Sequence, residues 1–71
     1  MTLTLKRLIM RVKQLRAKRE MSQYDLARVS GVSREYIARL ETGHHDPSLS
    51  TLEKLAKALK VKVGELIGGE K

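Results

Sequence analysis

The sequence predicts an all-α fold with five helices. Leu, Ile, Val and Ala recur at steps of three and four residues along most of the chain, which is the spacing of amphipathic helices. Serine or threonine precedes several of these segments and glycine follows two of them, as at helix ends. No segment alternates apolar and polar residues as a half-buried strand does. A chain of 71 residues suits one small domain with one modest core, so we expect a single domain over residues 1–71.

The first predicted helix covers residues 4 to 18, with Thr4 as its N-cap. Its polar face is almost wholly basic, since seven of the fifteen Lys and Arg residues fall within the first twenty positions and the only acid there is Glu20. Its apolar stripe is formed by Leu5, Leu8, Ile9, Val12 and Leu15.

Two short helices follow. Ser22 is predicted to cap a helix over Gln23–Ser30, which Gly31 ends in the left-handed conformation. Ser33 is predicted to cap the next helix, Arg34–Thr42, and Gly43 to close it in the same way. We expect Gly31 and Ala27 to let these two helices approach closely, so that they form a helix-turn-helix.

The fourth helix has two candidate starts. Ser48 follows Pro47 and can cap it, while Ser50 and Glu53 fit a capping box. We favour Ser48 and expect the helix over roughly 48 to 60. A final short helix carries Leu66 and Ile67, and residues 68–71 are expected to fray, which leaves about 4–67 structured.

Composition excludes several classes of protein. The chain has no Cys, hence no disulfide framework and no zinc-thiolate site. No apolar run is long enough for export or membrane insertion, so we expect the chain in the cytoplasm. His44, His45 and Asp46 do not make a complete metal-ligand set. No nucleophile with an adjacent base, phosphate loop or cofactor motif is present, so we expect neither an enzyme nor a cofactor.

The formal charge of +7 suggests a polyanionic partner, either nucleic acid or an anionic membrane surface. In the helix from residue 34, Ile37 and Leu40 mark the buried side at 100° per residue. The opposite face suits a DNA groove, because Arg can bind guanine or phosphate, Glu can bind cytosine N4, and Ala can approach a thymine methyl. That face and its flank carry Arg34, Glu35, Ala38, Arg39 and Thr42.

Plainer interpretations stay open for these residues. Glu35 and Arg39 lie four apart and can simply pair in solvent. Thr42 can be an ordinary surface residue near a helix end. Tyr36 can half-bury its ring or send its hydroxyl to a phosphate, and exposed Tyr24 has similar options. Ser33 is first a cap, although amides at a helix start also hold phosphates.

The stretch from Met21 to Val61 resembles the lambda repressor and Cro-type, or xenobiotic-response-element-type, helix-turn-helix family. The resemblance implies a compact five-helix fold whose third helix enters the major groove, usually in a homodimer on a near-palindromic operator. It also implies that Gln23 contacts a phosphate, and that Arg16 pairs with Glu41 to join two helices. The positions that carry it are Ser22-Gln23, Leu26-Ala27, Gly31-Val32-Ser33, Ile37, Leu40-Glu41, Gly43, Pro47-Ser48, Leu55-Ala56 and Ala58-Leu59.

The sequence departs from the family pattern at three positions. Glu20 and Lys60 stand where relatives often have a helix-ending Gly, so we expect strained or reshaped connections there. Lys62 replaces the usual cap of the last helix. Longer relatives continue into a ligand-binding or oligomerisation domain, and we expect no effector site of that kind.

The favoured function is therefore a sequence-specific regulator that binds double-stranded DNA as a dimer. Repressor, restriction-modification controller and antitoxin remain open, as does an unidentified protein partner. The alternative is a basic amphipathic domain that binds membrane surfaces. The predicted dimer contact uses Val61, Val63, Leu66 and Ile67. The predicted DNA-binding residues are Gln23, Ser33, Arg34, Glu35, Tyr36, Ala38, Arg39, Thr42 and His44.

Overall fold

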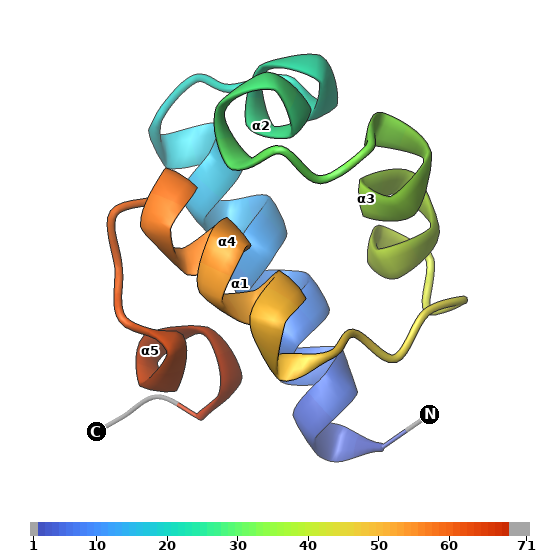
Figure 1. The fold of residues 1–71 in the computed structure, drawn as a ribbon. Helices are drawn as coiled ribbons and strands as arrows, with labels where there is room; N and C mark the ends of the chain where they lie inside the picture. The colour runs from blue at the N-terminus through green and yellow to red at the C-terminus, as the bar shows by residue number, and fades with distance from the viewer. Residues whose placement is uncertain (1, 69–71) are drawn as a thin grey trace.

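The computed structural model describes residues 2–68. The described residues form five helices and no strand, so the predicted all-α fold is confirmed (Figure 1). Of the predicted frayed tail, residues 68–71, only Gly68 is described, and its amide donates to the carbonyl of Gly64 at 3.0 Å as the C-cap of the last helix. The rest of that prediction lies outside the described part of the chain. In order, the helices are α1 (Leu3–Lys18), α2 (Gln23–Ser30), α3 (Arg34–Glu41), α4 (Leu49–Ala58) and α5 (Val63–Ile67).

The start of α1 differs from the prediction. Thr2, not Thr4, is the N-cap: its backbone is extended and its hydroxyl accepts a hydrogen bond from the amide of Leu5 at 3.1 Å. Both threonines have a side chain that can cap a helix. Capping by Thr2 satisfies a free amide of the first turn just as Thr4 would, and it also lengthens α1 at its N-terminus. The first turn therefore contains Leu3, which stays 64% exposed.

The predicted caps of α2, α3 and α4 are confirmed. The side chains of Ser22, Ser33 and Ser48 each accept a hydrogen bond from the amide three residues on. Gly31 ends α2 at φ 80°. A Cβ placed on Gly31 would meet no atom within 4 Å, so the expectation of a close approach at this residue is wrong. The backbone angle alone favours glycine there.

Helices α1, α3 and α4 end with the same pair of hydrogen bonds. After α1, the amide of Glu20 donates to the carbonyl of Ala17 at 3.0 Å, and the amide of Met21 donates to that of Arg16 at 2.9 Å. The bonds after α3 and α4 repeat this spacing, and the motif requires one left-handed residue. After α3 that residue is Gly43, at φ 82°. After α1 it is Glu20, at φ 55°, and after α4 it is Lys60, at φ 60°.

These turns set the ends of the helices. Because Lys60 is left-handed, α4 ends at Ala58 rather than continuing to residue 60 as predicted. Helix α3 ends at Glu41, one residue before its predicted end at Thr42, which is the C-cap. At α5, the Lys62 side chain makes no capping bond, but its amide donates to the Glu65 carboxylate at 2.8 Å. This bond satisfies only one of the free amides.

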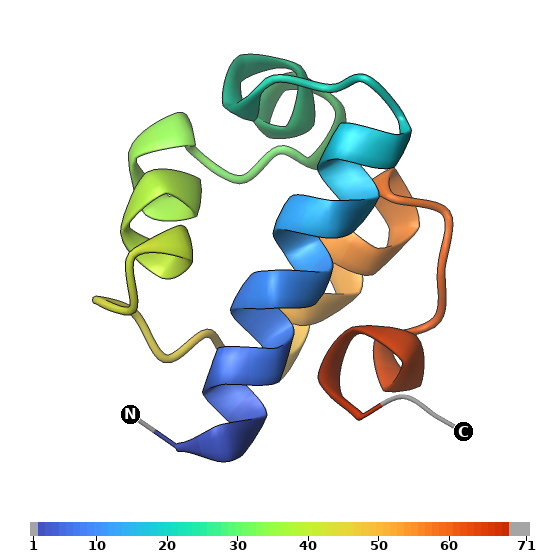
Figure 2. The same ribbon diagram turned by 180° about the vertical axis from the view of Figure 1, so that it is seen from behind.

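The five helices enclose one aliphatic core. Helix α1 contacts α3 and α5, α4 contacts α2 and α5, and α2 contacts α3. In both views α3 and α5 lie at opposite sides of the molecule, with α1 and α4 between them (Figures 1 and 2). Side chains that are fully buried come from every helix, and they are Val12, Leu26, Ile37, Leu40, Leu55, Leu59 and Leu66. The core therefore fixes α3 on one side of the bundle.

No helix within residues 2–68 is long and apolar enough to cross a membrane.

Replacing Glu20 by Gly should stabilise the fold. A residue with a Cβ loses about 1–2 kcal/mol in the left-handed conformation, whereas Gly loses about 0.5–1 kcal/mol through its greater freedom in the unfolded chain. We expect a net gain of under about 1 kcal/mol, seen as a higher urea midpoint. The control is Lys13→Gly at an exposed position inside α1, which should lower stability by about 1 kcal/mol. A lower midpoint for Glu20→Gly would contradict the strain argument.

Candidate nucleic-acid interface

The outer face of α3 is the candidate interface. Ile37 and Leu40 are completely buried and hold the helix against the core. The predicted groove-facing residues lie on the other side, where Arg34, Glu35, Arg39 and Thr42 are exposed and Ala38 is half-buried. Within residues 2–68, the two ion pairs that occur do not include a Glu35–Arg39 pair. Both charged groups therefore face solvent without neutralising each other.

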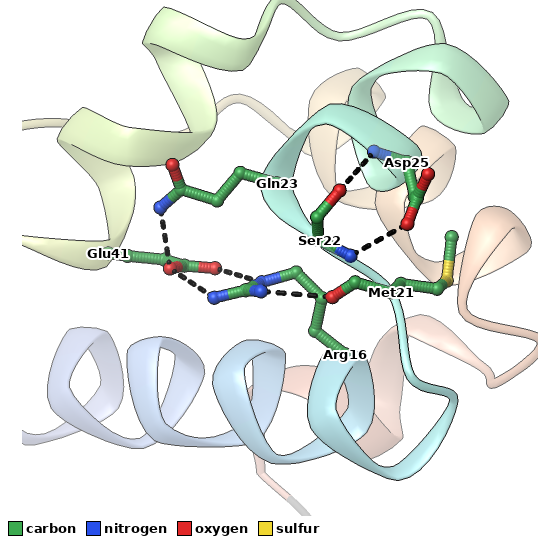
Figure 3. A network of polar contacts seen from close by, with 6 residues as sticks. All are labelled: Arg16, Met21, Ser22, Gln23, Asp25 and Glu41. Carbon is green, nitrogen blue, oxygen red and sulfur yellow. Dashed lines mark hydrogen bonds and ion pairs between the residues drawn. The ribbon is translucent and has the colours of Figure 1, made fainter.

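A buried carboxylate fixes the C-terminal end of α3. Glu41, whose side chain is only 4% exposed, accepts hydrogen bonds from Arg16 Nε to Oε2 and from Arg16 Nη2 to Oε1, both at 2.9 Å (Figure 3). The third nitrogen of Arg16, Nη1, donates to the carbonyl of Met21 at 3.0 Å. The ion pair implied by the resemblance is confirmed, and it is the two-bond geometry that favours Arg over Lys.

The same carboxylate holds the first residue of α2. Gln23 Nε2 donates to Glu41 Oε1 at 3.0 Å (Figure 3). An amide nitrogen carries two protons, so a second N–H remains for another acceptor. The predicted phosphate contact of Gln23 remains a prediction. The network joins α1, α2 and α3 through one side chain.

A capping box places Gln23 at the start of α2. The Asp25 amide donates to the Ser22 hydroxyl at 3.0 Å, and the Ser22 amide donates to the Asp25 carboxylate at 2.9 Å (Figure 3). The Ser22 backbone bond, with help from the Ser22 hydroxyl, lowers the pKa of Asp25 below its ordinary value. Because the pKa of Asp25 is lower in the folded protein than in the unfolded chain, its ionised carboxylate stabilises the fold at pH values above the unfolded-state pKa. This contribution is lost as the pH falls through the pKa of the folded protein.

Two aromatic contacts flank α3. The Arg34 guanidinium carbon lies 4.6 Å from the ring centroid of Tyr24 on α2. The ring of Tyr36 stacks on that of His45, with centroids 4.3 Å apart and planes 12° from parallel. Tyr36 is half-buried, as one of its two predicted options requires. Local sequence patterns predict neither pair, because each joins α3 to a different segment of the chain.

A family model described as helix-turn-helix (HTH_3) matches residues 12–66, which is most of the chain. This chain belongs to the lambda repressor/Cro-type helix-turn-helix family. The family consists of DNA-binding transcriptional regulators and not of enzymes.

Relatives extend across phages, bacteria and archaea. The immunity repressor protein of Bacillus phage phi105 is 42% identical over 60 residues, which cover 84% of this chain. The chain spans only 42% of the length of that repressor. An uncharacterised helix-turn-helix transcriptional regulator of Archaeoglobus fulgidus is 41% identical over 56 residues, with 79% of each chain covered.

A solved structure of the family has the same fold. The restriction-modification controller protein C.AhdI from Aeromonas hydrophila matches with a TM-score of 0.83 and 37% sequence identity. The match covers 87% of this chain and 94% of the controller. The compact five-helix arrangement is therefore that of the helix-turn-helix family.

The C-terminal end of this helix-turn-helix has its own polar contacts. The Thr42 hydroxyl donates to the carbonyls of Ala38 and Arg39, each at 3.1 Å, and lies 2.9 Å from His44 Nδ1. A hydroxyl has one proton, so His44 Nδ1–H donates to Thr42 when that proton is used within α3. His44 is exposed beside this end of the helix.

The loop between α3 and α4 places its two histidines beside an aspartate. His44, His45 and Asp46 line an open hollow with Thr2 and Leu5. Across residues 2–68, no three side chains of His, Cys, Asp or Glu come together as a metal-binding group would require.

The predicted dimer residues do not share one environment. Leu66 is completely buried in the core of this one chain, so its side chain cannot form an intermolecular contact. The sequence pattern alone does not distinguish a core residue from an interface residue in so short a helix. Val61, Val63 and Ile67 are half-buried and pack against the core from outside.

Removing Glu41 should destabilise the fold strongly. Glu41→Ala leaves the guanidinium of Arg16, whose side chain is only 20% exposed, without its partner, and we expect a loss of about 2–4 kcal/mol in urea unfolding. Because the unpaired charge causes most of this loss, the double variant Arg16→Met/Glu41→Leu should lose less than Glu41→Ala. Glu53→Ala, at an exposed site on α4, serves as control and should change stability by less than about 0.5 kcal/mol. Equal effects at residues 41 and 53 would contradict a structural role for the pair.

Proposed function

We propose that this chain is a sequence-specific regulator that binds double-stranded DNA as a homodimer, with α3 in the major groove of a near-palindromic operator. One observation carries the proposal. The charged residues on the outer face of α3 are exposed and take part in neither ion pair found within residues 2–68, while the opposite face is anchored in the core by Ile37, Leu40 and Glu41. A rigid helix with free hydrogen-bonding groups is what base readout needs.

The residues of α3 divide by the chemistry that they offer. Arg34 and Arg39 can bind guanine O6 and N7 with two hydrogen bonds, Glu35 can accept from cytosine N4, and Ala38 can contact a thymine methyl. Thr42 lies at the far end of the same face and offers its hydroxyl oxygen as an acceptor. These five positions are the proposed base-reading set.

A second set is proposed to hold the DNA backbone. Gln23 has one amide proton left beside Glu41, and Ser33 lies at the start of α3, where free amides favour phosphate. Tyr36 and His44 lie on the flank and at the end of the helix. The charge of +7 adds long-range attraction to the phosphates.

Dimerisation is proposed through α5 and the segment before it. One α3 reads only a few base pairs, so specificity requires two copies, and two-fold symmetry places half-sites about one helical turn apart. Val61, Val63 and Ile67 remain partly exposed. Since α5 lies across the molecule from α3 (Figure 1), a contact there leaves both recognition helices free.

The regulatory role is proposed from the relatives. The phi105 relative is an immunity repressor and C.AhdI is a restriction-modification controller, so control of transcription in the cytoplasm is the role that they support. We propose that residues 1–71 act as one DNA-binding domain. The two relatives differ in regulatory type, and a further protein partner is compatible with either.

Selection of bound duplexes from a random pool tests the function directly. We expect one consensus with two half-sites, and an affinity that falls steeply with salt because each neutralised phosphate adds about 0.9 to the log-log slope. Arg39→Ala should lower affinity by about 1–3 kcal/mol and relax the preference at one or two positions. Gln23→Ala should instead weaken all sequences evenly.

Lys57→Ala is the matched control for charge, since Lys57 is an exposed cation near the end of α4. It should leave the consensus intact. Tight binding to anionic vesicles with no duplex preference would support the membrane-surface alternative and reject DNA recognition. An unchanged consensus for Arg39→Ala would show that α3 reads DNA with a different face.

Sedimentation tests the proposed dimer. We expect a dimer for the wild type and a shift towards monomer for Ile67→Lys, because a charge placed in an apolar contact remains unpaired. Val29→Lys is the control, since Val29 is an apolar residue of α2 that is 52% exposed and lies outside the proposed contact. Circular dichroism confirms that each variant is folded. A wild type that is monomeric both alone and on its selected duplex would refute this assembly.

A further inference from the structure

Tyr24 is an aromatic residue with no role in the core. It lies two residues after the N-cap of α2, and 68% of it is exposed. Single exposed aromatic side chains are common on protein surfaces, so the exposure of Tyr24 alone indicates no function. The informative feature is what the ring of Tyr24 contacts.

The ring of Tyr24 contacts the first residue of α3. The Arg34 guanidinium carbon is 4.6 Å from the ring centroid, within the distance at which a cation is attracted to an aromatic face. Neither of the two ion pairs found within residues 2–68 involves Arg34. The ring thus restrains a side chain that would otherwise sample many rotamers.

Contact with a ring leaves the guanidinium able to bind DNA. Arginine hydrogen bonds lie in the plane of the guanidinium, whereas an aromatic ring takes one of its faces. Guanine recognition uses two N–H groups at the edge of that plane. A guanidinium packed on Tyr24 can therefore keep its donors free while its orientation is restricted.

We infer that Tyr24 is a positioning residue, which holds Arg34 in the orientation that reads its base. The inference rests on the proposed function of α3 and assigns a specificity role to a residue of α2. Holding Arg34 before binding reduces the conformational entropy lost when the complex forms. Loss of an exposed contact of this kind should weaken binding to the preferred duplex about two- to fivefold.

The first test uses the DNA-free protein. The ring current of Tyr24 should shift the Arg34 Hε resonance upfield in NMR spectra. Tyr24→Leu keeps apolar bulk but removes the aromatic ring, so this shift should be lost, while Tyr24→Phe should retain it. The urea midpoints of both variants should match the wild type because the side chain is mostly exposed. An Arg34 resonance that Tyr24→Leu leaves unmoved would overturn the contact itself.

The second test measures preference on the selected duplex and its single-base variants. Arg34→Ala should identify the base pair that depends on Arg34. Tyr24→Leu should relax preference at that same pair and leave the Arg39-dependent pairs unchanged, and Tyr24→Phe should restore it. The double variant Tyr24→Leu/Arg34→Ala should be no worse than Arg34→Ala alone, because Tyr24 acts through Arg34.

Other outcomes overturn the inference in distinguishable ways. Equal weakening of every duplex by Tyr24→Leu and by Tyr24→Phe would assign the tyrosine hydroxyl to a phosphate instead. Additive effects of the two substitutions would show that Tyr24 acts independently of Arg34. A wild-type preference that Tyr24→Leu leaves intact rejects the positioning role alone. A wild type with no duplex preference rejects the proposed function and this role together.

Discussion

A buried negative charge is tolerated only where donors surround it, and the Glu41 carboxylate meets this condition with three hydrogen bonds. Two come from Arg16 on α1 and one from Gln23 on α2. Because Glu41 is the last residue of α3, satisfying its charge also fixes one end of that helix relative to two others. The orientation of the outer face of α3 is thus tied to the electrostatics of the interior.

The other end of α3 depends on the backbone rather than on charge. Gly31 supplies a left-handed residue and Ser33 a capping hydroxyl, so the chain can turn and restart a helix within three residues. Ile37 and Leu40 then bury the inner side. A short helix of this kind would not be stable alone, and its geometry comes from these attachments.

The sequence predicts the helices well where signals are local. Ser22, Ser33 and Ser48 lie directly before apolar periodic segments, and each caps a helix as expected. Thr4 fails because Thr2 offers the same chemistry two residues earlier. The predicted interface role of Leu66 is wrong because the residue is completely buried, and a count of apolar residues does not show how much surface the core can cover.

Contacts between distant segments of the chain are not predicted by local sequence patterns. One of them is implied by the family resemblance, and the other is not predicted at all. The Arg16–Glu41 pair spans 25 residues, and periodicity within either helix does not select it. The placing of Arg34 over Tyr24 depends on the angle between α2 and α3, which no local pattern specifies. The geometry of both contacts is defined only in the folded chain. The sequence shows only that an aromatic residue, Tyr24, lies near the start of α2.

The separation of inner and outer positions on α3 has a consequence for how such proteins diverge. Ile37, Leu40 and Glu41 are buried and maintain the fold, while the charged outward positions Arg34, Glu35 and Arg39 are exposed. Substitutions at exposed sites usually change stability by less than about 0.5 kcal/mol. Descendants of a duplicated copy can therefore drift towards new target sites one outward side chain at a time, and the duplicated scaffold remains folded at every intermediate step.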